Sequence, residues 1–439
     1  MTNETRVGNR WIVALAGTAL QMCLGTVYAW SVFQKPLVAN FHWSQTWTAM
    51  TFSLAIVFLG LAAAAGGMQL GRFGPRKLAV TGGALFGAGY LVAAFALSIK
   101  SLPLLYLGYG VIGGVGLGLG YVTPVATAAK WFPDKKGLVT GMVVMGFGFG
   151  ALLMSLFFAP MLMKATHGNL VAVFAWLGVI LGTLAIVAAL FLRNPPAGYV
   201  PAGYVPRQAP LVTDGLKEIQ KERSAADSIF SSRFAIMWLV FFCNITAGIA
   251  MVSFTSPLMQ EVWVRAHPPM NATKEALAAY WLSVASIGAT LVAISSLFNG
   301  IGRFFWGAVS DRIGRAQTFQ TMLASQVLVF TALMVTHNPI LFAVLICYIL
   351  LCYGGGFGTM PSFVLDAYGP KRMPVMYGTI LTAWSAGGFV GPLIIGFLKD
   401  HFASQASYFA FLLAAGVLII GLVLSTALSN ETERGAGRA

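Results

Sequence analysis

A single arginine, Arg303, stands in the apolar, glycine-rich stretch LFNGIGRFFWGAVSDRIGR at residues 297–315. It lies eight residues before Asp311, which marks the predicted end of the same helix. At 1.5 Å per residue this separation is about 12 Å, so Arg303 falls near the middle of a ~30 Å apolar layer. A guanidinium stays charged in proteins and offers two parallel N–H donors that match a carboxylate. We therefore expect Arg303 to anchor an anionic substrate.

The sequence supplies no acidic partner for Arg303. All 13 Asp and Glu residues fall in predicted loops, tails or span ends, and Asp366, which comes closest, adjoins the Gly369-Pro370-Lys371 turn. A charge at the centre of a bilayer costs at least about 2.5 kcal/mol and has to be compensated. An anion bound from outside would compensate it. The alternative is that Arg303 ties helices together through carbonyls and hydroxyls.

Other side chains at suitable depth could complete the site. Asn299 lies four residues before Arg303, on the same helix face, where it would contact the anion, hold the guanidinium or pack against another helix. Tyr353 and Phe357 share a face in the same way. For each ring, helix packing is the alternative. The expected substrate-binding residues are Arg303, Asn299, Tyr353, Tyr121, Phe357, Tyr28 and Trp384.

Composition places these residues in a membrane. The 439 residues are 58% hydrophobic and 9% charged, whereas a soluble domain has about 25% charged residues. Stretches long enough to cross a ~30 Å hydrocarbon core can be placed twelve times, which predicts an all-α membrane protein with twelve transmembrane helices. They lie near 11–33, 47–70, 78–98, 104–129, 138–163, 169–192, 234–257, 283–308, 317–336, 339–365, 374–398 and 406–428.

The basic residues indicate how these spans are oriented. The net charge is +14, with 27 Lys and Arg residues. Apart from Arg303, those outside the termini and the even-numbered gaps are Lys35, Lys100, Lys164, Arg265, Lys274 and Lys399. Because positively charged loops stay in the cytoplasm, we expect both termini to be cytoplasmic, in the inner membrane. The positive charge is thus explained by the orientation of the spans in the membrane, and nucleic acid is not an expected partner.

The chain divides into two similar halves. Residues 193–233 are the longest connection and separate six spans from six. GMQLGRFGPRK at 67–77 resembles GAVSDRIGR at 307–315, at an offset of 240, and residues 123–141 resemble residues 360–378 at an offset of 237. This duplication predicts two pseudo-symmetric six-helix bundles, 1–192 and 234–439. We expect the 193–233 segment to be a tether, with a regulatory role as the alternative.

The repeated loop GxxxDRxGR resembles the loop motif of the major facilitator superfamily. The resemblance implies a latch in which the aspartate braces helix ends when the transporter is open to the outside. The expected latch residues are Asp311, Arg312, Arg315, Gly67 and Arg72. The first copy departs from the motif, because Gly71 replaces the aspartate and Pro75 the final arginine. This departure weakens the expectation for the N-terminal half of the latch.

Longer stretches are similar to one branch of that superfamily, the oxalate–formate exchangers with bacterial lactate and pyruvate transporters. They are GTVYAWSVFQKPL (25–37), GYVTPVATAAKWFPDKKGLVTGMVVMGFGFGALL (120–153), LFNGIGRFFWGAVSDRIGR (297–315) and YGGGFGTMPSFVLDAYG (353–369). The resemblance implies that Arg303 binds substrate and that the first, fourth, tenth and eleventh spans line an aromatic cavity.

The eleventh span bears on the substrate. The oxalate exchanger has a buried lysine in a Thr-Ala-Lys sequence, where this chain reads Thr382-Ala383-Trp384. With Arg303 as the single buried cation, one charge of a dianion would stay uncompensated, at several kcal/mol. We therefore expect a secondary transporter of a small monocarboxylate such as lactate, pyruvate or formate. The alternatives are an oxalate/formate-type dicarboxylate exchanger and a membrane sensor of small organic anions.

The sequence lacks the motifs expected of an enzyme or a metal site. No buried acid pair, HExxH motif or Cys-x-x-Cys pair occurs in the sequence, and all five histidines fall on the outer side. We expect neither an enzyme nor a cofactor or metal site, and the expected partners are the lipid bilayer and a small carboxylate anion. A co-transported proton and a counter-transported anion both stay open as the coupling species. We expect a monomer.

Overall fold

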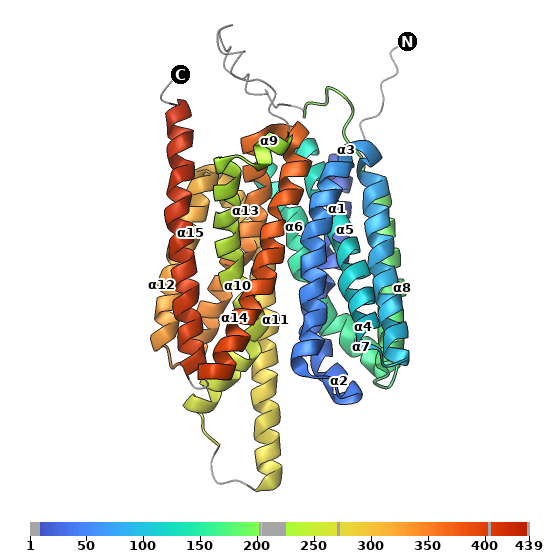
Figure 1. Cartoon of the computed structure of the whole chain (residues 1–439), viewed down its shortest axis with the longest axis vertical. Coiled ribbons are helices and arrows are strands. Elements are labelled where there is room, and N and C mark those ends of the chain that lie inside the picture. The colour runs from blue at the N-terminus through green and yellow to red at the C-terminus, as the bar shows by residue number, and fades with distance from the viewer. Residues whose placement is uncertain (1–8, 202, 204–224, 270–272, 403–404, 437–439) are drawn as a thin grey trace.

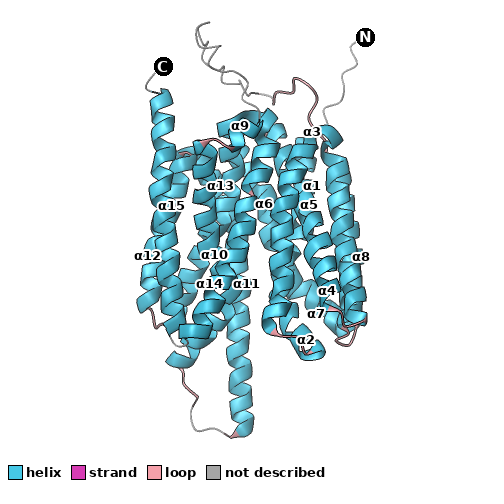
Figure 2. Ribbon diagram, viewed as in Figure 1, coloured by secondary structure: helices cyan, strands magenta, loops and turns pink. Residues whose placement is uncertain are grey.

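The computed structural model describes residues 9–201, 203, 225–269, 273–402 and 405–436, and every regular element among them is a helix (Figure 2). The first half contains α1 (Arg10–Gly25), the 3-10 turn η1 (Thr26–Ala29), α2 (Trp30–Phe41), α3 (Gln45–Ser98), α4 (Leu102–Leu105), the π-helix η2 (Tyr106–Gly113), α5 (Gly114–Trp131), α6 (Lys136–Leu153), the π-helix η3 (Met154–Phe158), α7 (Ala159–Ala165) and α8 (Leu170–Leu190). The second contains α9 (Ala225–Ile229), α10 (Ser232–Ala266), α11 (Lys274–Ile313), α12 (Arg315–Val335), α13 (Pro339–Ile380), α14 (Thr382–Phe402) and α15 (Ala406–Ala436).

Twelve spans follow from ten long helices. Ten helices of the described chain are long and apolar enough to cross a membrane, and two of them, Trp47–Ser98 and Pro339–Gly391, have 52 and 53 residues. Each of these is interrupted by a glycine with positive φ, Gly74 and Gly369. Proline follows both glycines, so the chain reverses there and each long helix counts as two spans. The prediction of an all-α membrane protein with twelve transmembrane helices is confirmed.

Several helix boundaries differ from the prediction. Helix α11 begins at Lys274 rather than near residue 283, because the hydroxyl of Thr273 caps it by accepting the N–H of Ala276 at 3.4 Å. The first span is not one straight helix: α1 gives way to η1 and α2. Of the predicted connection 193–233, residues 204–224 lie outside the described part, and α9 follows them.

The helices form two bundles side by side (Figure 1). Helices α1, α3, α5, α6 and α8 pack on one another, as do α10 to α15. The start of α1 and the end of α15 lie at the same end of the molecule, which we call the terminal end (Figure 1). The domain limits of residues 192 and 234 stay a prediction.

Two seams join the bundles, one between α6 and α11 and one between α3 and the end of α13. A Cβ on Gly307 would lie 2.7 Å from the carbonyl oxygen of Gly137, and a Cβ on Gly141 would lie 2.6 Å from that of Arg303. In the second seam, Gly67 abuts the carbonyl of Pro374 and Gly378 that of Ala63 in the same way. The offset of 240 residues relates Gly67 and Ala63 to Gly307 and Arg303, and the offset of 237 relates Pro374 and Gly378 to Gly137 and Gly141. The two halves of the duplicated sequence therefore make equivalent contacts between the bundles.

Candidate functional site

Arg303 is fixed where α11 crosses two other helices. Its side chain is fully buried, with 0% exposure. Its carbonyl oxygen packs against Gly141 of α6 and, more closely still, against Gly358 of α13. Because a Cβ at either glycine would collide with this backbone, the small residues let three helices meet at the arginine.

The guanidinium has only neutral neighbours among the described residues. Its Nε donates to Oδ1 of Asn299, and its Nη1 donates to the hydroxyl of Tyr121 and the carbonyl of Val144, each at 3.4 Å. These are long hydrogen bonds, and Nη2 has no acceptor in the described part of the chain. The ring of Phe357 lies 4.6 Å from the guanidinium carbon. Ring faces and weak hydrogen bonds therefore surround a charge that lacks a counter-ion there.

An aromatic cluster covers the guanidinium, with Trp384 of α14 at its centre. The indole lies 4.6 Å from the ring of Phe357, 5.3 Å from Tyr121 and 5.8 Å from Tyr28, measured between ring centroids. The hydroxyls of Tyr28 and Tyr353 are 2.8 Å apart and form a hydrogen bond between the two bundles. All seven residues expected to bind substrate thus lie in one connected cluster; their binding of a substrate stays a prediction.

Three neighbours were missed from the sequence. Phe147 of α6 lies 5.2 Å from the guanidinium carbon and 5.5 Å from the ring of Trp384. Val144 supplies the carbonyl described above, and Tyr377 places a buried hydroxyl beside Tyr121. Phe147 is one of two rings in the GFGFG run of α6, and nothing in the sequence distinguishes it from Phe149 as a neighbour of Arg303.

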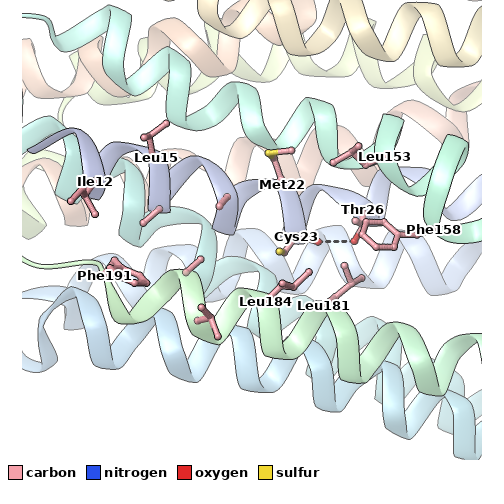
Figure 3. Close-up of a pocket in the computed structure, with 14 residues that line it drawn as sticks. Ile12, Leu15, Met22, Cys23, Thr26, Leu153, Phe158, Leu181, Leu184 and Phe191 are labelled. Carbon is pink, nitrogen blue, oxygen red and sulfur yellow. Dashed lines mark hydrogen bonds between the residues drawn. The ribbon is translucent and has the colours of Figure 1, made fainter.

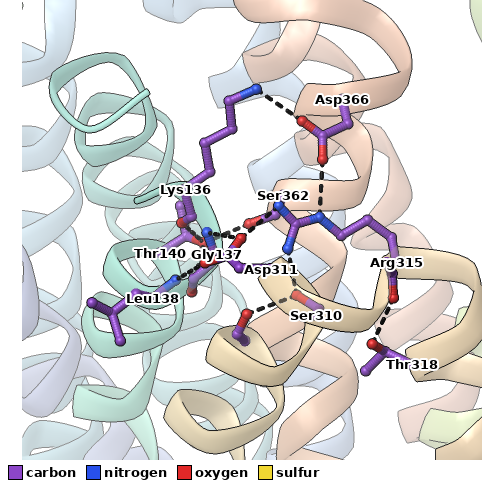
Figure 4. A network of polar contacts seen from close by, with 12 residues as sticks. Lys136, Gly137, Leu138, Thr140, Ser310, Asp311, Arg315, Thr318, Ser362 and Asp366 are labelled. Carbon is purple, nitrogen blue, oxygen red and sulfur yellow. Dashed lines mark hydrogen bonds and ion pairs between the residues drawn. The ribbon is translucent and has the colours of Figure 1, made fainter. Parts of the chain in front are cut away.

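The predicted latch lies at the terminal end of the α6–α11 seam (Figure 4). Asp311 accepts the backbone N–H of Gly137 at 3.1 Å and of Leu138 at 3.0 Å. These N–H groups belong to the first turn of α6, which has no internal acceptor for them and carries the positive end of the helix dipole. Asp311 also pairs with Arg315 at 2.7 Å. One carboxylate thus connects both bundles.

A second carboxylate extends this network. Asp366 of α13 pairs with Lys136 of the other bundle and with Nε of Arg315, each at 2.9 Å, and the hydroxyls of Thr140 and Ser362 lie 3.0 Å apart below them (Figure 4). The other three predicted latch residues take no part in this network of ion pairs. Gly67 packs against Pro374 in the second seam, whereas Arg72 and Arg312 are exposed and lie outside the network as far as the described residues extend.

A separate apolar cavity of about 500 Å³ lies between α1, the region of η3 and α8 (Figure 3). Leu15, Met22, Leu153 and Leu184 are among its walls. The hydroxyl of Thr26, which also lines it, is already bonded to the carbonyl of Cys23 at 2.7 Å. None of the described residues that line it is charged, so they offer a small carboxylate no counter-ion.

Comparison with known proteins agrees with this architecture. The chain is 28% identical over 424 residues to an "Oxalate:formate antiporter" of Oxalobacter formigenes, covering 96% of this chain and 91% of that protein. It is 26% identical to "Apicoplast pyruvate carrier 1" of Toxoplasma gondii, covering 86% and 82%. It is 25% identical to "Monocarboxylate transporter 13" of Rattus norvegicus, covering 97% and 91%.

Solved structures show the same fold. The E. coli fucose:proton symporter FucP superposes with a TM-score of 0.66 at 14% identity, covering 95% of this chain and 98% of that one. A double-tryptophan mutant of XylE gives a TM-score of 0.68 at 14% identity, covering 94% of both chains. The Major Facilitator Superfamily model matches residues 11–263 and 268–438. The chain therefore belongs to the Major Facilitator Superfamily.

Proposed function

We propose that this protein is a secondary transporter of small monocarboxylates, with Arg303 as the substrate anchor. The observation that carries the proposal is the fully buried guanidinium, whose neighbours among the described residues are all neutral. An unpaired buried charge is expensive. A substrate carboxylate would pair with it bidentately and could use the Nη2 group that has no acceptor in the described chain.

A single cation favours a monocarboxylate. Arg303 is the one charged side chain in the cluster described above, and Trp384 occupies the centre of its aromatic neighbours. A dianion would bring a second charge that these rings cannot neutralise. The relatives named as a pyruvate carrier and a monocarboxylate transporter support this choice. The relative named as an oxalate:formate antiporter supports the alternative, a dicarboxylate exchanger.

The remaining donors favour lactate or pyruvate over formate. Nε1 of Trp384 is buried and has no acceptor at hydrogen-bonding geometry in the described chain, although it lies beside the hydroxyl of Tyr353. A carboxylate on Arg303 with an oxygen on its neighbouring carbon would supply one more acceptor to this cluster. Formate has no such oxygen, so it would leave that donor without a partner.

Transport would proceed by alternating access. The ion pairs and glycine contacts of the two seams hold the terminal end shut, so this end must separate to release substrate there. We propose that it faces the cytoplasm of the inner membrane, as the distribution of Lys and Arg predicts. We further propose that transport is coupled either to a proton or to a counter-transported anion. The proposed transporter is a monomer.

The proposed function is tested by measuring uptake of labelled carboxylates into vesicles that contain the reconstituted protein. Labelled lactate, pyruvate, formate and oxalate would be offered to the wild type, Arg303→Lys and Arg303→Ala, with Arg265→Ala as the control that removes an exposed arginine. We expect lactate or pyruvate uptake in the wild type and the control, and loss of at least tenfold in both Arg303 variants. Normal uptake by Arg303→Ala would refute the anchor. A sensor would bind lactate and move none.

A further inference from the structure

The internal repeat relates the α6–α11 seam to the α3–α13 seam, but the two seams differ at one equivalent position. In the α6–α11 seam, Asp311 carries the carboxylate that reaches from α11 to the other bundle. The offset of 240 residues places Gly71 at the corresponding position of α3, four residues after the seam contact Gly67. A Cβ built on Gly71 would have no contacting atom of the described chain within 4 Å. The space that an aspartate side chain would fill at this position is therefore free.

A cavity of about 480 Å³ occupies that place. Its walls include Gly71, Pro374 and Val375, together with the ammonium-bearing residues Lys130 and Lys371. No Asp or Glu is among the described residues that line it. Where one seam has a carboxylate, the other therefore has two cations around an open space.

The two lysines belong to different bundles. Lys130 lies in the last turn of α5 and donates to Oδ1 of Asn194 at 3.2 Å, while Lys371 lies at the start of the second half of α13 and is exposed. An anion held between them would bridge the bundles, as Asp311 does in the other seam.

We propose that this cavity, the Gly71 cavity, binds a phosphate group that bridges the bundles and stabilises the closed α3–α13 seam. Lysine is a point-charge ligand suited to phosphate, whereas the planar fork of arginine suits a carboxylate. A doubly charged phosphate neutralises both ammonium groups, and the volume also admits a headgroup. Basic pockets between transmembrane helices receive such headgroups, so the source is either free inorganic phosphate or an anionic lipid.

Binding is measurable without any transported substrate, so this inference stands apart from the function proposed above. Thermal unfolding of purified protein in neutral detergent would be followed with sodium phosphate and with sodium chloride at equal ionic strength. Native mass spectrometry would count phosphatidylglycerol or phosphatidylcholine molecules retained by the same protein. The variants are Lys130→Gln/Lys371→Gln, Gly71→Asp and the control Lys77→Gln, which removes an exposed lysine outside the cavity lining.

We expect phosphate to raise the Tm of the wild type and of Lys77→Gln by about 2–4 °C, or phosphatidylglycerol but not phosphatidylcholine to be retained by both. The double lysine variant should lose this shift. Gly71→Asp should not respond either, because its own carboxylate fills the cavity; its Tm without phosphate should match or exceed that of the wild type. A shift with phosphate alone identifies the free ion, and retention of phosphatidylglycerol identifies the lipid. No response of the wild type to either, or an equal shift in the double variant, overturns the proposal.

Discussion

The hydroxyl of Tyr28 lies 2.8 Å from that of Tyr353, and this hydrogen bond joins the two bundles beside the buried Arg303. Tyr28 comes from η1, where the first span bends, and Tyr353 comes from α13. The side chain of Arg303 has 0% exposure, so it lies in a closed compartment beside this pair. Under the proposed function, access of substrate to Arg303 requires that contacts between the bundles break.

Removal of either tyrosine hydroxyl should make this compartment easier to open. We expect Tyr28→Phe and Tyr353→Phe each to weaken the bundle contact by about 0.5–1.5 kcal/mol. The double variant should cost no more than either single one, because both remove the same bond. A double-mutant cycle on thermal unfolding measures this. Additive effects of the two substitutions would show that the bond contributes nothing. Tyr348→Phe is the matched control, since its bond to Ser325 lies within one bundle.

The packing of Gly358 against the carbonyl of Arg303 should tolerate no side chain. Gly358→Ala places a Cβ against backbone that cannot move aside, so we expect destabilisation of about 1–3 kcal/mol and loss of transport. Gly416→Ala on α15 is the control, because a Cβ there meets nothing within 4 Å. Thermal unfolding and vesicle uptake measure both effects. A wild-type-like Gly358→Ala protein would contradict the described crossing of α11 and α13.

Loss of the latch charge should open the terminal end. Asp311→Asn keeps an oxygen for the N–H groups of α6 but loses the charge that the helix dipole and Arg315 favour. We expect the closed state to lose about 1–2 kcal/mol. A Ser362→Cys probe inside the seam reports opening as faster alkylation, since the native cysteines are buried.

The latch prediction has its own control. Arg312→Ala removes an exposed charge from the same helix and should leave the alkylation rate of the probe unchanged. High salt should reduce the difference between the wild type and Asp311→Asn, because these ion pairs are partly exposed. Equal alkylation rates in Asp311→Asn and the wild type at low salt would remove Asp311 from the latch.

A second buried cation should change substrate preference. Trp384→Lys adds a second buried cation to the cluster around Arg303, so we expect oxalate uptake to appear and lactate uptake to fall at least tenfold. Trp384→Phe keeps a neutral ring and should transport no oxalate. Competition of labelled lactate uptake by unlabelled oxalate measures the change. Efficient oxalate uptake by the wild type would refute the single-cation argument.

Much of the fold could be predicted because the bilayer imposes simple rules on sequence. Long apolar runs specify helices, and the repeat of residues 67–77 at 307–315 specifies two similar bundles. The sequence also places Arg303 eight residues before Asp311 on one helix; its depth in the bilayer stays a prediction. These features are local, so a single sequence contains them.

The site could be predicted only where a residue differs chemically from its surroundings. Arg303 and Asn299 are polar in an apolar span, whereas Phe147 and Tyr377 are two rings among 32 Phe and 13 Tyr. Asp366 is predicted beside a turn, and the structure pairs it with Lys136 across the seam, a partner 230 residues away. Contacts between distant helices depend on rotation and tilt, which hydropathy does not encode.

The backbone of Arg303 has a mechanical consequence. Its carbonyl is wedged between Gly141 of one bundle and Gly358 of the other, while its guanidinium lies among the candidate substrate residues only a side chain away. Under the proposed function, the residue that would bind the anion is therefore also the residue at which α11 contacts both bundles. Binding of a carboxylate at the guanidinium would act directly on this contact, with no intervening side chain.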